Sequence, residues 1–265
     1  MNRKHPLILL ILLFISISLT LQAEMANPTD PFPQKPHVLI YTKNGEGYVH
    51  KNIENSVQAL KKLLDKNDMT YEASEDPSLF TSEKLKQFDV LIFSNTNNEA
   101  FDNDMQRKAF QEYIQNGGGF VGIHSASGSE RAWPWFWAML GGKFYRHSKF
   151  QSFNVVKIDP DHPSATPVPD YWEREDESYY LKELNPGIHV ILATDLTSID
   201  DPQAHEEYPA NTFGKYFPVT WCHNFDGGYQ WYTSLGHLPE HYDDPVFMNH
   251  ILGGIQWVLE ARSKP

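Results

Sequence analysis

The 265-residue sequence contains only one cysteine, Cys222. A single thiol excludes an intrachain disulfide, so the hydrophobic core must hold the fold together. No cysteine near the N-terminus is available for lipid attachment, and the protein is therefore not expected to be a lipoprotein.

Basic residues are also scarce, with 22 Lys and Arg against 34 Asp and Glu and a formal net charge of −12. Binding to nucleic acid depends on Lys and Arg that neutralise phosphates, so nucleic acid is not an expected partner. No Gly-x-Gly-x-x-Gly fingerprint stands between a predicted strand and the helix after it, so no dinucleotide cofactor is indicated.

Long apolar runs are missing from the sequence as well. The uncharged run from Leu7 to Leu21 is short of the about 20 residues that cross a membrane. It follows Arg3 and Lys4 and precedes Gln22-Ala23, which is the layout of a secretory signal peptide over residues 1–23. We therefore expect export to the periplasm or the medium, with no stable membrane insertion once the signal is cleaved. The sequence leaves open whether the segment is instead retained as an anchor.

Removal of residues 1–23 takes away two basic and no acidic side chains, and −12 − 2 gives a charge of −14. Residues 24–36 are rich in proline and predict a flexible tether. Residues 37–261 then predict one α/β domain, because no second linker or internal repeat divides them.

The first half of this domain alternates strands and helices. Apolar runs predict strands over residues 37–42, 69–73, 89–93 and 120–123, and amphipathic spacing predicts helices over residues 50–67, over residues 82–86 from a Ser82 cap, and from an Asp102 cap to Gly117. This alternation is typical of a parallel sheet covered by helices on both faces.

The second half is different. Strands over residues 153–158, 189–194, 217–222 and 229–233 predict an antiparallel extension of the same sheet, with Gly227-Gly228 as a hairpin turn. A last helix is expected over residues 245–259.

His124 directly follows the predicted strand 120–123. Ligands of open parallel sheets bind at the carboxyl ends of strands, which makes His124 a candidate site residue. Gly122 and Ala126 flank it with the small side chains of a nucleophile elbow. A hydrolase would have Ser at this position and an amidotransferase Cys, so the pattern disfavours acyl transfer. Histidine instead indicates proton transfer or metal ligation.

Several ordered motifs now resemble those of one family. They include Gly117 to Ala126, Leu140-Gly-Gly142, His147, Asp176 to Tyr179, Pro218 to His223 and Ser234 to His237. Together they resemble the trehalose-utilisation (ThuA-like) family over about residues 37 to 259. The resemblance implies a class I glutamine-amidotransferase-like, flavodoxin-like three-layer sandwich without the amidotransferase cysteine, and a role in metabolism of trehalose and related glycosides. Cys222 and Asn224 are assigned no role.

The candidate site residues follow strands or glycine pairs. We predict catalytic roles for His124, Glu177 and His223, and substrate contacts for His50, His147, Tyr179, Trp221 and His237. The sequence has no compact zinc signature, since Pro239 disfavours a helix across the spacing His237-Leu-Pro-Glu-His241. The need for a divalent metal and the oligomeric state are left open.

Three functions are compatible with these residues. The leading hypothesis is an exported enzyme that acts on a trehalose-like glycoside or keto-sugar by histidine acid/base chemistry, with or without a metal. The alternatives are a non-catalytic carbohydrate-binding protein and a metal-dependent hydrolase of another substrate class. The resemblance implies a small carbohydrate as the ligand, and the aromatic content of 14% suits the apolar faces of such a ligand.

Overall fold

The computed structural model describes residues 35–201 and 215–263, which belong to one compact unit. The predicted signal peptide and residues 24–34 of the predicted tether lie outside the described residues. None of the described helices combines the length and apolar character that crossing a membrane requires.

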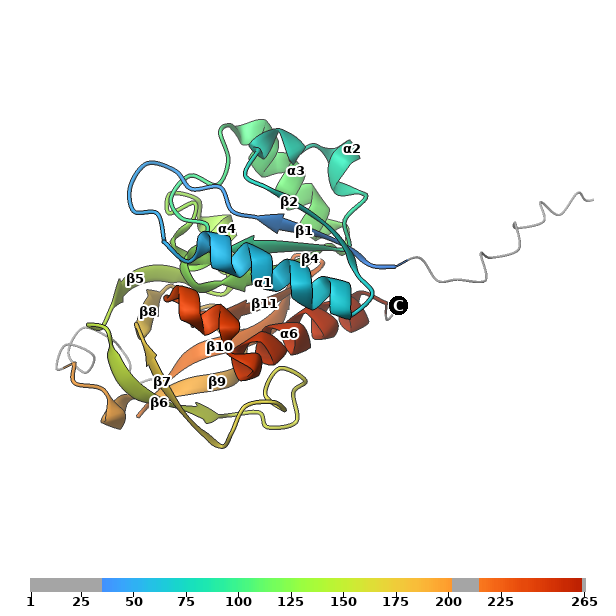
Figure 1. The fold of residues 1–265 in the computed structure, drawn as a ribbon. Coiled ribbons are helices and arrows are strands. Elements are labelled where there is room, and N and C mark those ends of the chain that lie inside the picture. Colours follow the sequence, from blue (N-terminus) through green and yellow to red (C-terminus); the bar gives the residue numbers. More distant parts are fainter. Residues whose placement is uncertain (1–34, 202–214, 264–265) are drawn as a thin grey trace, which may run out of the picture. The chain divides into compact units, whose positions relative to one another are not determined.

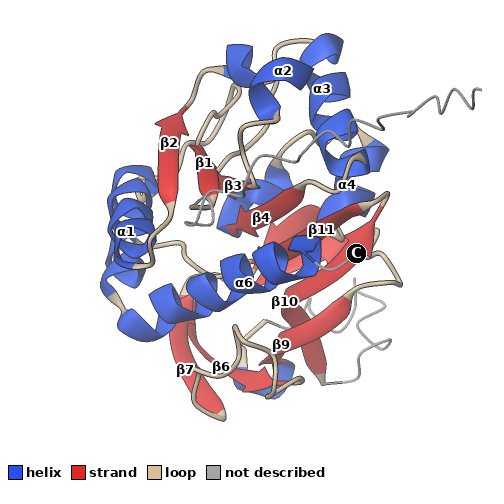
Figure 2. Cartoon of the chain, turned by 90° about the vertical axis from the view of Figure 1, so that its right-hand side faces the viewer, coloured by secondary structure: helices blue, strands red, loops and turns tan. Residues whose placement is uncertain are grey.

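A nine-stranded sheet forms the centre of this unit, in the order β2-β1-β3-β4-β11-β10-β9-β6-β7 (Figures 1 and 2). The first five strands in this order are parallel: β2 (Thr70–Ser74), β1 (His37–Tyr41), β3 (Val90–Ser94), β4 (Gly119–Ile123) and β11 (Gly228–Thr233). Their carboxyl ends therefore lie along one edge of the sheet. Gly117, Gly119 and Gly122 have the spacing of a dinucleotide-binding fingerprint. Gly117 lies just before β4, and Gly119 and Gly122 lie within it, whereas the fingerprint follows a strand.

The other half of the sheet is antiparallel, as the sequence predicted. It comprises β10 (Tyr216–Phe225), β9 (His189–Asp195), β6 (Gln151–Lys157) and β7 (Tyr171–Asp176). A separate two-stranded sheet pairs β5 (Lys143–His147) with β8 (Tyr179–Lys182). The sequence did not predict β5, β7 or β8.

Helices cover both faces of the sheet and make three layers (Figure 1). One face carries α1 (Ile53–Lys66) and α6 (Pro245–Ser263). The other carries α3 (Asp104–Gln115) and the shorter helices α2 (Ser82–Leu85) and α4 (Pro134–Leu140). The strands lack polar alternation because both faces are buried: Val38 and Ile40 pack with α1 and α6, whereas Leu39 and Tyr41 pack with α3. The predicted fold class, a flavodoxin-like three-layer sandwich, is confirmed.

Short 3₁₀ helices complete the chain: η1 (Pro77–Leu79), η2 (His124–Gly128), η3 (Leu196–Ser198) and η5 (Pro239–Asp243). Two predicted helix caps were wrong by one residue. Thr81, not Ser82, accepts a hydrogen bond from the Lys84 amide at 3.2 Å, and Asn103, not Asp102, accepts from two amides at 3.1 Å. A capping residue keeps an extended backbone just before the first helical turn, and Thr81 and Asn103 have that conformation.

Helix α6 approaches the sheet closely because it carries Gly253 and Gly254 on its buried face. A Cβ at Gly254 would lie 2.4 Å from the Trp231 ring, and one at Gly253 would lie 2.4 Å from the Pro163 carbonyl oxygen. These glycines lower the intrinsic stability of the helix but permit this contact. Close packing at this point therefore outweighs helix propensity.

We expect Gly253→Ala to lower the free energy of unfolding by about 1–3 kcal/mol, because the new methyl group would overpack against backbone. Gln256→Ala, on the exposed side of the same helix, should be neutral or slightly stabilising, since alanine favours helix. Urea unfolding of both variants measures this, and a Gly253→Ala variant as stable as the parent protein would contradict the close-packing argument.

Candidate functional site

The carboxyl ends of β1, β4 and β11 bring three histidines together. His50 lies in the loop between β1 and α1, His124 directly follows β4, and His237 follows β11. Ile123, the last residue of β4, pairs with Ser94 of β3 and Thr233 of β11, so these strands end in register. The parallel half of the sheet therefore assembles one site from distant parts of the sequence.

The turn after β4 has the elbow geometry predicted for it. His124 has a φ of 53°, a left-handed conformation that is uncommon outside glycine. A Cβ on Gly122 would meet the Tyr232 ring at 2.9 Å and the Ala126 Cβ at 3.4 Å, so this tight turn has no room for a larger residue there. The Tyr232 hydroxyl donates to the His124 carbonyl oxygen at 2.8 Å and stabilises the turn.

Four side chains converge where His124 points. The His124 Nε2 atom lies 3.2 Å from His50 Nε2 and 3.4 Å from His237 Nδ1. Glu177, between β7 and β8, places its Oε2 atom 3.1 Å from His237 Nδ1. One potential ligand atom from each of these residues lies within 4.8 Å of all the others, and we call His50, His124, Glu177 and His237 the histidine cluster.

Burial and neighbouring charges set the protonation of the cluster. Burial, with the nearby His50, holds the pKa of His124 well below its usual range, and burial lowers the pKa of His50 to about 4. Burial also acts to lower the pKa of His237, but the hydrogen bond and charge of Glu177 outweigh it and raise that pKa. The lowered pKa values favour neutral imidazoles at His124 and His50 near pH 7, and a neutral imidazole has one nitrogen lone pair.

A buried carboxylate and a buried amide orient the cluster. Asp176 is fully buried and accepts hydrogen bonds from the Gly236 and Glu177 amides, at 2.9 and 2.8 Å. Asn52, at the start of α1, donates to the Gly236 carbonyl at 2.6 Å and the His237 carbonyl at 3.0 Å. Asp176 and Asn52 therefore act as positioning residues for Glu177 and His237.

A cavity of about 390 Å³ opens above the cluster. This volume falls within the about 300–1,000 Å³ typical of small-molecule sites. Its walls mix aromatic, amide and charged side chains: Tyr48, His50, Asn97, Ser125, Gly128, Arg131, Phe144, His147, Glu177, Tyr179 and His237. His124 lies beneath this floor and is fully buried.

Five predicted site residues line this cavity, and two contribute contacts that the sequence did not specify. His147 Nδ1 lies 3.5 Å from Glu177 Oε1, on the opposite side of that carboxylate from His237. The Tyr179 hydroxyl lies 2.9 Å from His124 Nε2. Arg131 and Phe144 were not predicted, because nothing in their local sequence marks them as neighbours of the sheet edge.

Trp221 and His223 are not among the residues that line the cavity. Trp221 is fully buried and donates to the Leu140 carbonyl, and His223 bonds to the Met139 carbonyl through Nε2 at 2.8 Å. Both lie on β10, which runs antiparallel to β11, and His223 pairs with Gln230, itself the partner of Phe120 near the start of β4. The hairpin thus places His223 toward the opposite edge of the sheet. The sequence motifs had instead grouped His223 with His124.

His241, which shares a zinc-like spacing with His237, turns away from the cluster. Its Nε2 atom bonds to the Glu175 carbonyl at 3.0 Å, and its Nδ1 atom faces Asp176. The spacing does not form a ligand pair, in agreement with the expectation from Pro239.

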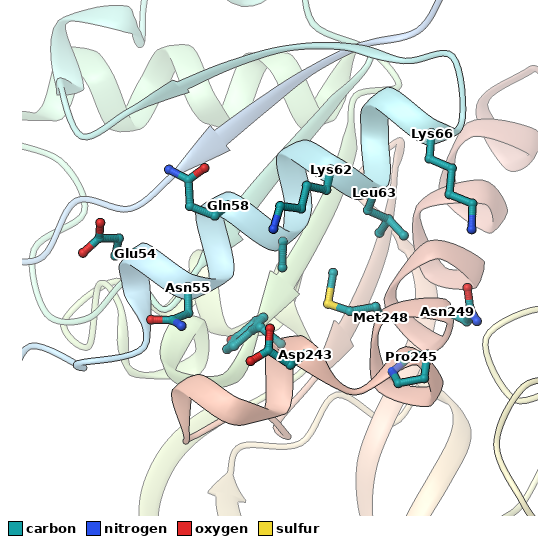
Figure 3. Close-up of a pocket in the computed structure, with 12 residues that line it drawn as sticks. Glu54, Asn55, Gln58, Lys62, Leu63, Lys66, Asp243, Pro245, Met248 and Asn249 are labelled. Atoms are coloured by element: carbon teal, nitrogen blue, oxygen red, sulfur yellow. The ribbon is translucent and has the colours of Figure 1, made fainter.

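A larger cavity, of about 600 Å³, lies between α1 and the start of α6 (Figure 3). Its lining includes Gln58 and Lys62 of α1, Asp243 of η5 and Met248 of α6. It lies away from the strand ends and contains no histidine. Size alone would favour it, but the smaller cavity holds the converging titratable groups, which makes the smaller one the better candidate site.

The histidine cluster suits two kinds of chemistry. Neutral imidazoles and a carboxylate exchange protons with a bound molecule, and the same atoms are the ligands that divalent transition metals prefer. Ser125, the serine that lines the cavity, is not supported as a nucleophile, because its Oγ atom has no hydrogen-bond partner among the described residues and so no base beside it.

Comparisons with solved structures support the fold. A putative ThuA-like protein from Bacteroides uniformis ATCC 8492 is 25% identical with a TM-score of 0.66, over 88% of this chain and 95% of that chain. One from Parabacteroides merdae ATCC 43184 is 17% identical with a TM-score of 0.65, over 86% and 91%. A putative GMP synthase protein from Thermoplasma acidophilum shares only the fold, at 11% identity and a TM-score of 0.51, over 88% of this chain and 100% of that chain.

No curated protein matches the chain. The family model described as "Trehalose utilisation" matches residues 37–258, which is most of the chain and includes every residue of the histidine cluster. This match, together with the glutamine-amidotransferase-like fold, shows that the chain belongs to the ThuA family.

Proposed function

We propose that this protein is an enzyme of carbohydrate metabolism that acts on a trehalose-like glycoside or keto-sugar in the cavity above the histidine cluster. The observation that carries the proposal is the convergence of three histidines and Glu177, from four separate segments, at the floor of a cavity whose walls mix polar and aromatic side chains. A cluster of titratable groups at a strand-end cavity is the usual setting of a reaction centre. The description of the family model, trehalose utilisation, supports the choice of substrate class.

The walls of the cavity suit a sugar. Asn97 and Arg131 offer hydrogen-bond donors for hydroxyl and carbonyl oxygens, and Glu177 offers an acceptor. Tyr48 and Phe144 present aromatic rings to the apolar face of a pyranose. The cavity therefore combines polar and stacking contacts without a cluster of like charges.

Proton transfer is the chemistry that these groups support. Hydrogens next to a ketone are acidic enough for removal by a positioned base, so eliminative or hydrolytic cleavage of a keto-glycoside, or its isomerisation, fits the site. His147 is half exposed, donates from Nδ1 to the Ser148 carbonyl oxygen at 2.7 Å, lies 3.5 Å from Glu177 Oε1, and lies outside the cluster. It is the imidazole with the best access to a bound sugar, while the cluster below supplies the lone pair of His124 and the Glu177 carboxylate.

We expect His124→Asn to lower kcat on keto-glycosides at least about 100-fold, the lower end of what one acid/base group contributes. Asparagine tolerates a left-handed backbone and keeps a donor near the Nδ1 position, so the turn after β4 should survive while the Nε2 atom is lost. His189→Asn, at an exposed position on β9, is the control. Turnover of a panel of trehalose-like and 3-keto glycosides measures the effect.

Unchanged turnover by a folded His124→Asn variant would remove the histidine cluster from the mechanism. Calorimetric binding of a sugar by the parent protein, with no consumption of any ligand in the panel, would instead favour the non-catalytic carbohydrate-binding alternative.

We expect Tyr48→Ala to weaken sugar binding by about 2- to 10-fold, the loss of one stacking contact of about 0.5–1.5 kcal/mol. Its ring is 59% exposed and contacts His50 edge-on, at a centroid distance of 4.8 Å. Because the Tyr48 side chain meets the cluster only through this ring contact with His50, KM should rise while kcat stays within about twofold. Tyr171→Ala, an exposed tyrosine at the start of β7, is the matched control and should leave both constants unchanged.

A further inference from the structure

We propose that the histidine cluster binds one divalent transition-metal ion through His50 Nε2, His124 Nε2, His237 Nδ1 and a carboxylate oxygen of Glu177. The site stands on the geometry of these four side chains. It does not depend on which molecule the cavity takes.

The spacing of the ligand atoms matches a metal centre. A tetrahedral ion with metal–nitrogen bonds of 2.0–2.1 Å holds its ligands about 3.3–3.4 Å apart. The contacts within the cluster are 3.2 Å between His124 and His50, 3.4 Å between His124 and His237, and 3.1 Å between His237 and Glu177. All four ligand atoms lie within 4.8 Å of one another, so a single ion can reach them with small side-chain adjustments.

Hydrogen bonding alone does not satisfy the cluster. His124 Nδ1 lies 2.7 Å from the Ser234 carbonyl oxygen, which only accepts, so Nδ1 carries the proton and Nε2 of the neutral ring has one lone pair. Three groups crowd that lone pair: the Tyr179 hydroxyl at 2.9 Å, His50 at 3.2 Å and His237 at 3.4 Å.

The Tyr179 hydroxyl finds a partner in His124 within this arrangement, and His237 Nδ1 finds one in Glu177. His50 does not. If His50 Nε2 carries the proton, it points at the His124 lone pair that already accepts from the Tyr179 hydroxyl. If His50 Nε2 carries a lone pair instead, that lone pair faces the lone pair of His124. The Nδ1 atom of His50 has no partner among the described residues. A cation between the nitrogens removes this conflict, because each imidazole then donates its lone pair to the ion.

The surroundings have the form of a metal site's outer shell. Metal-binding histidines usually donate their second nitrogen to a carbonyl or carboxylate, as His124 does to Ser234. Asp176 holds the amides of Gly236 and Glu177, and Asn52 holds the carbonyl of His237, so the ligand-bearing segments are fixed before an ion binds.

The ligand set indicates the class of ion. Three imidazoles and one carboxylate suit Zn²⁺, Fe²⁺, Co²⁺, Ni²⁺ or Mn²⁺, whereas Mg²⁺ and Ca²⁺ take oxygen ligands. His50, Glu177 and His237 also line the cavity while His124 lies beneath it, so the ion would lie at the cavity floor. A sugar carbonyl or hydroxyl oxygen is then the expected cavity ligand; only this last statement rests on the proposed function. The cluster would orient and polarise that oxygen, and His147 would be left to move protons.

The test is metal content measured by mass spectrometry on protein purified without a histidine tag and without chelators. We expect about one equivalent of one first-row metal per chain in the parent protein, and less than about 0.1 equivalent in His50→Ala and Glu177→Gln. His147→Ala, a cavity histidine outside the cluster, is the matched control and should keep its metal. Circular dichroism and thermal unfolding check that each variant is folded.

Cobalt provides a second readout that needs no substrate. Chelator-stripped parent protein titrated with Co²⁺ should develop the intense visible absorption of a four- or five-coordinate site, saturating at about one equivalent, and Glu177→Gln should not. Folded parent protein with neither stoichiometric metal nor this absorption would overturn the proposal, as would cluster variants that retain metal like His147→Ala. Because neither measurement uses a sugar, a failure of the proposed function leaves these results unaffected.

Discussion

The hydrogen bond from His124 Nδ1 to the Ser234 carbonyl, 2.7 Å long and fully buried, determines how the site is arranged. It joins the ends of β4 and β11, and it selects the tautomer in which Nε2 carries the lone pair. The left-handed turn after β4 aims the ring, and the tight packing of Gly122, Ala126 and Tyr232 stabilises that turn. His50, His237 and Tyr179 are all arranged around the single nitrogen that this bond orients.

Strand direction explains which residues reach the site. Parallel strands share the edge at which they end, so the segments after β1, β4 and β11 meet although their histidines are up to 187 positions apart, from His50 to His237. The hairpin into β11 reverses direction, and β10 therefore carries Trp221 and His223 away from that edge. The sheet uses its parallel half for the cluster, while its antiparallel half continues the core and supplies Asp176 and Glu177 at and beyond the end of β7.

Two neighbouring carboxylates, those of Asp176 and Glu177, shape the electrostatics of the site. Asp176 is completely buried and lies among the amides of Gly236 and Glu177, an arrangement that makes a buried carboxylate tolerable. Glu177 beside it faces two histidines, so one carboxylate links the cluster to His147 on the cavity wall. Glu177 thus connects the buried histidine cluster with His147, a more exposed imidazole on the cavity wall. This arrangement is consistent with the family's description, trehalose utilisation.

The sequence by itself determined eight of the nine strands of the central sheet, its covering helices except α4, the family, and the place of His124 directly after a central strand. Apolar runs and glycines are local signals, and they follow directly from burial on both faces and from tight turns. The sequence did not reveal β7, because its buried positions include Arg174 and Asp176, whose polar side chains hide the apolar alternation of a strand. Tertiary structure alone decided which histidines meet, because the distances within the cluster depend on strand order, strand direction and buried hydrogen bonds between segments that are remote in sequence.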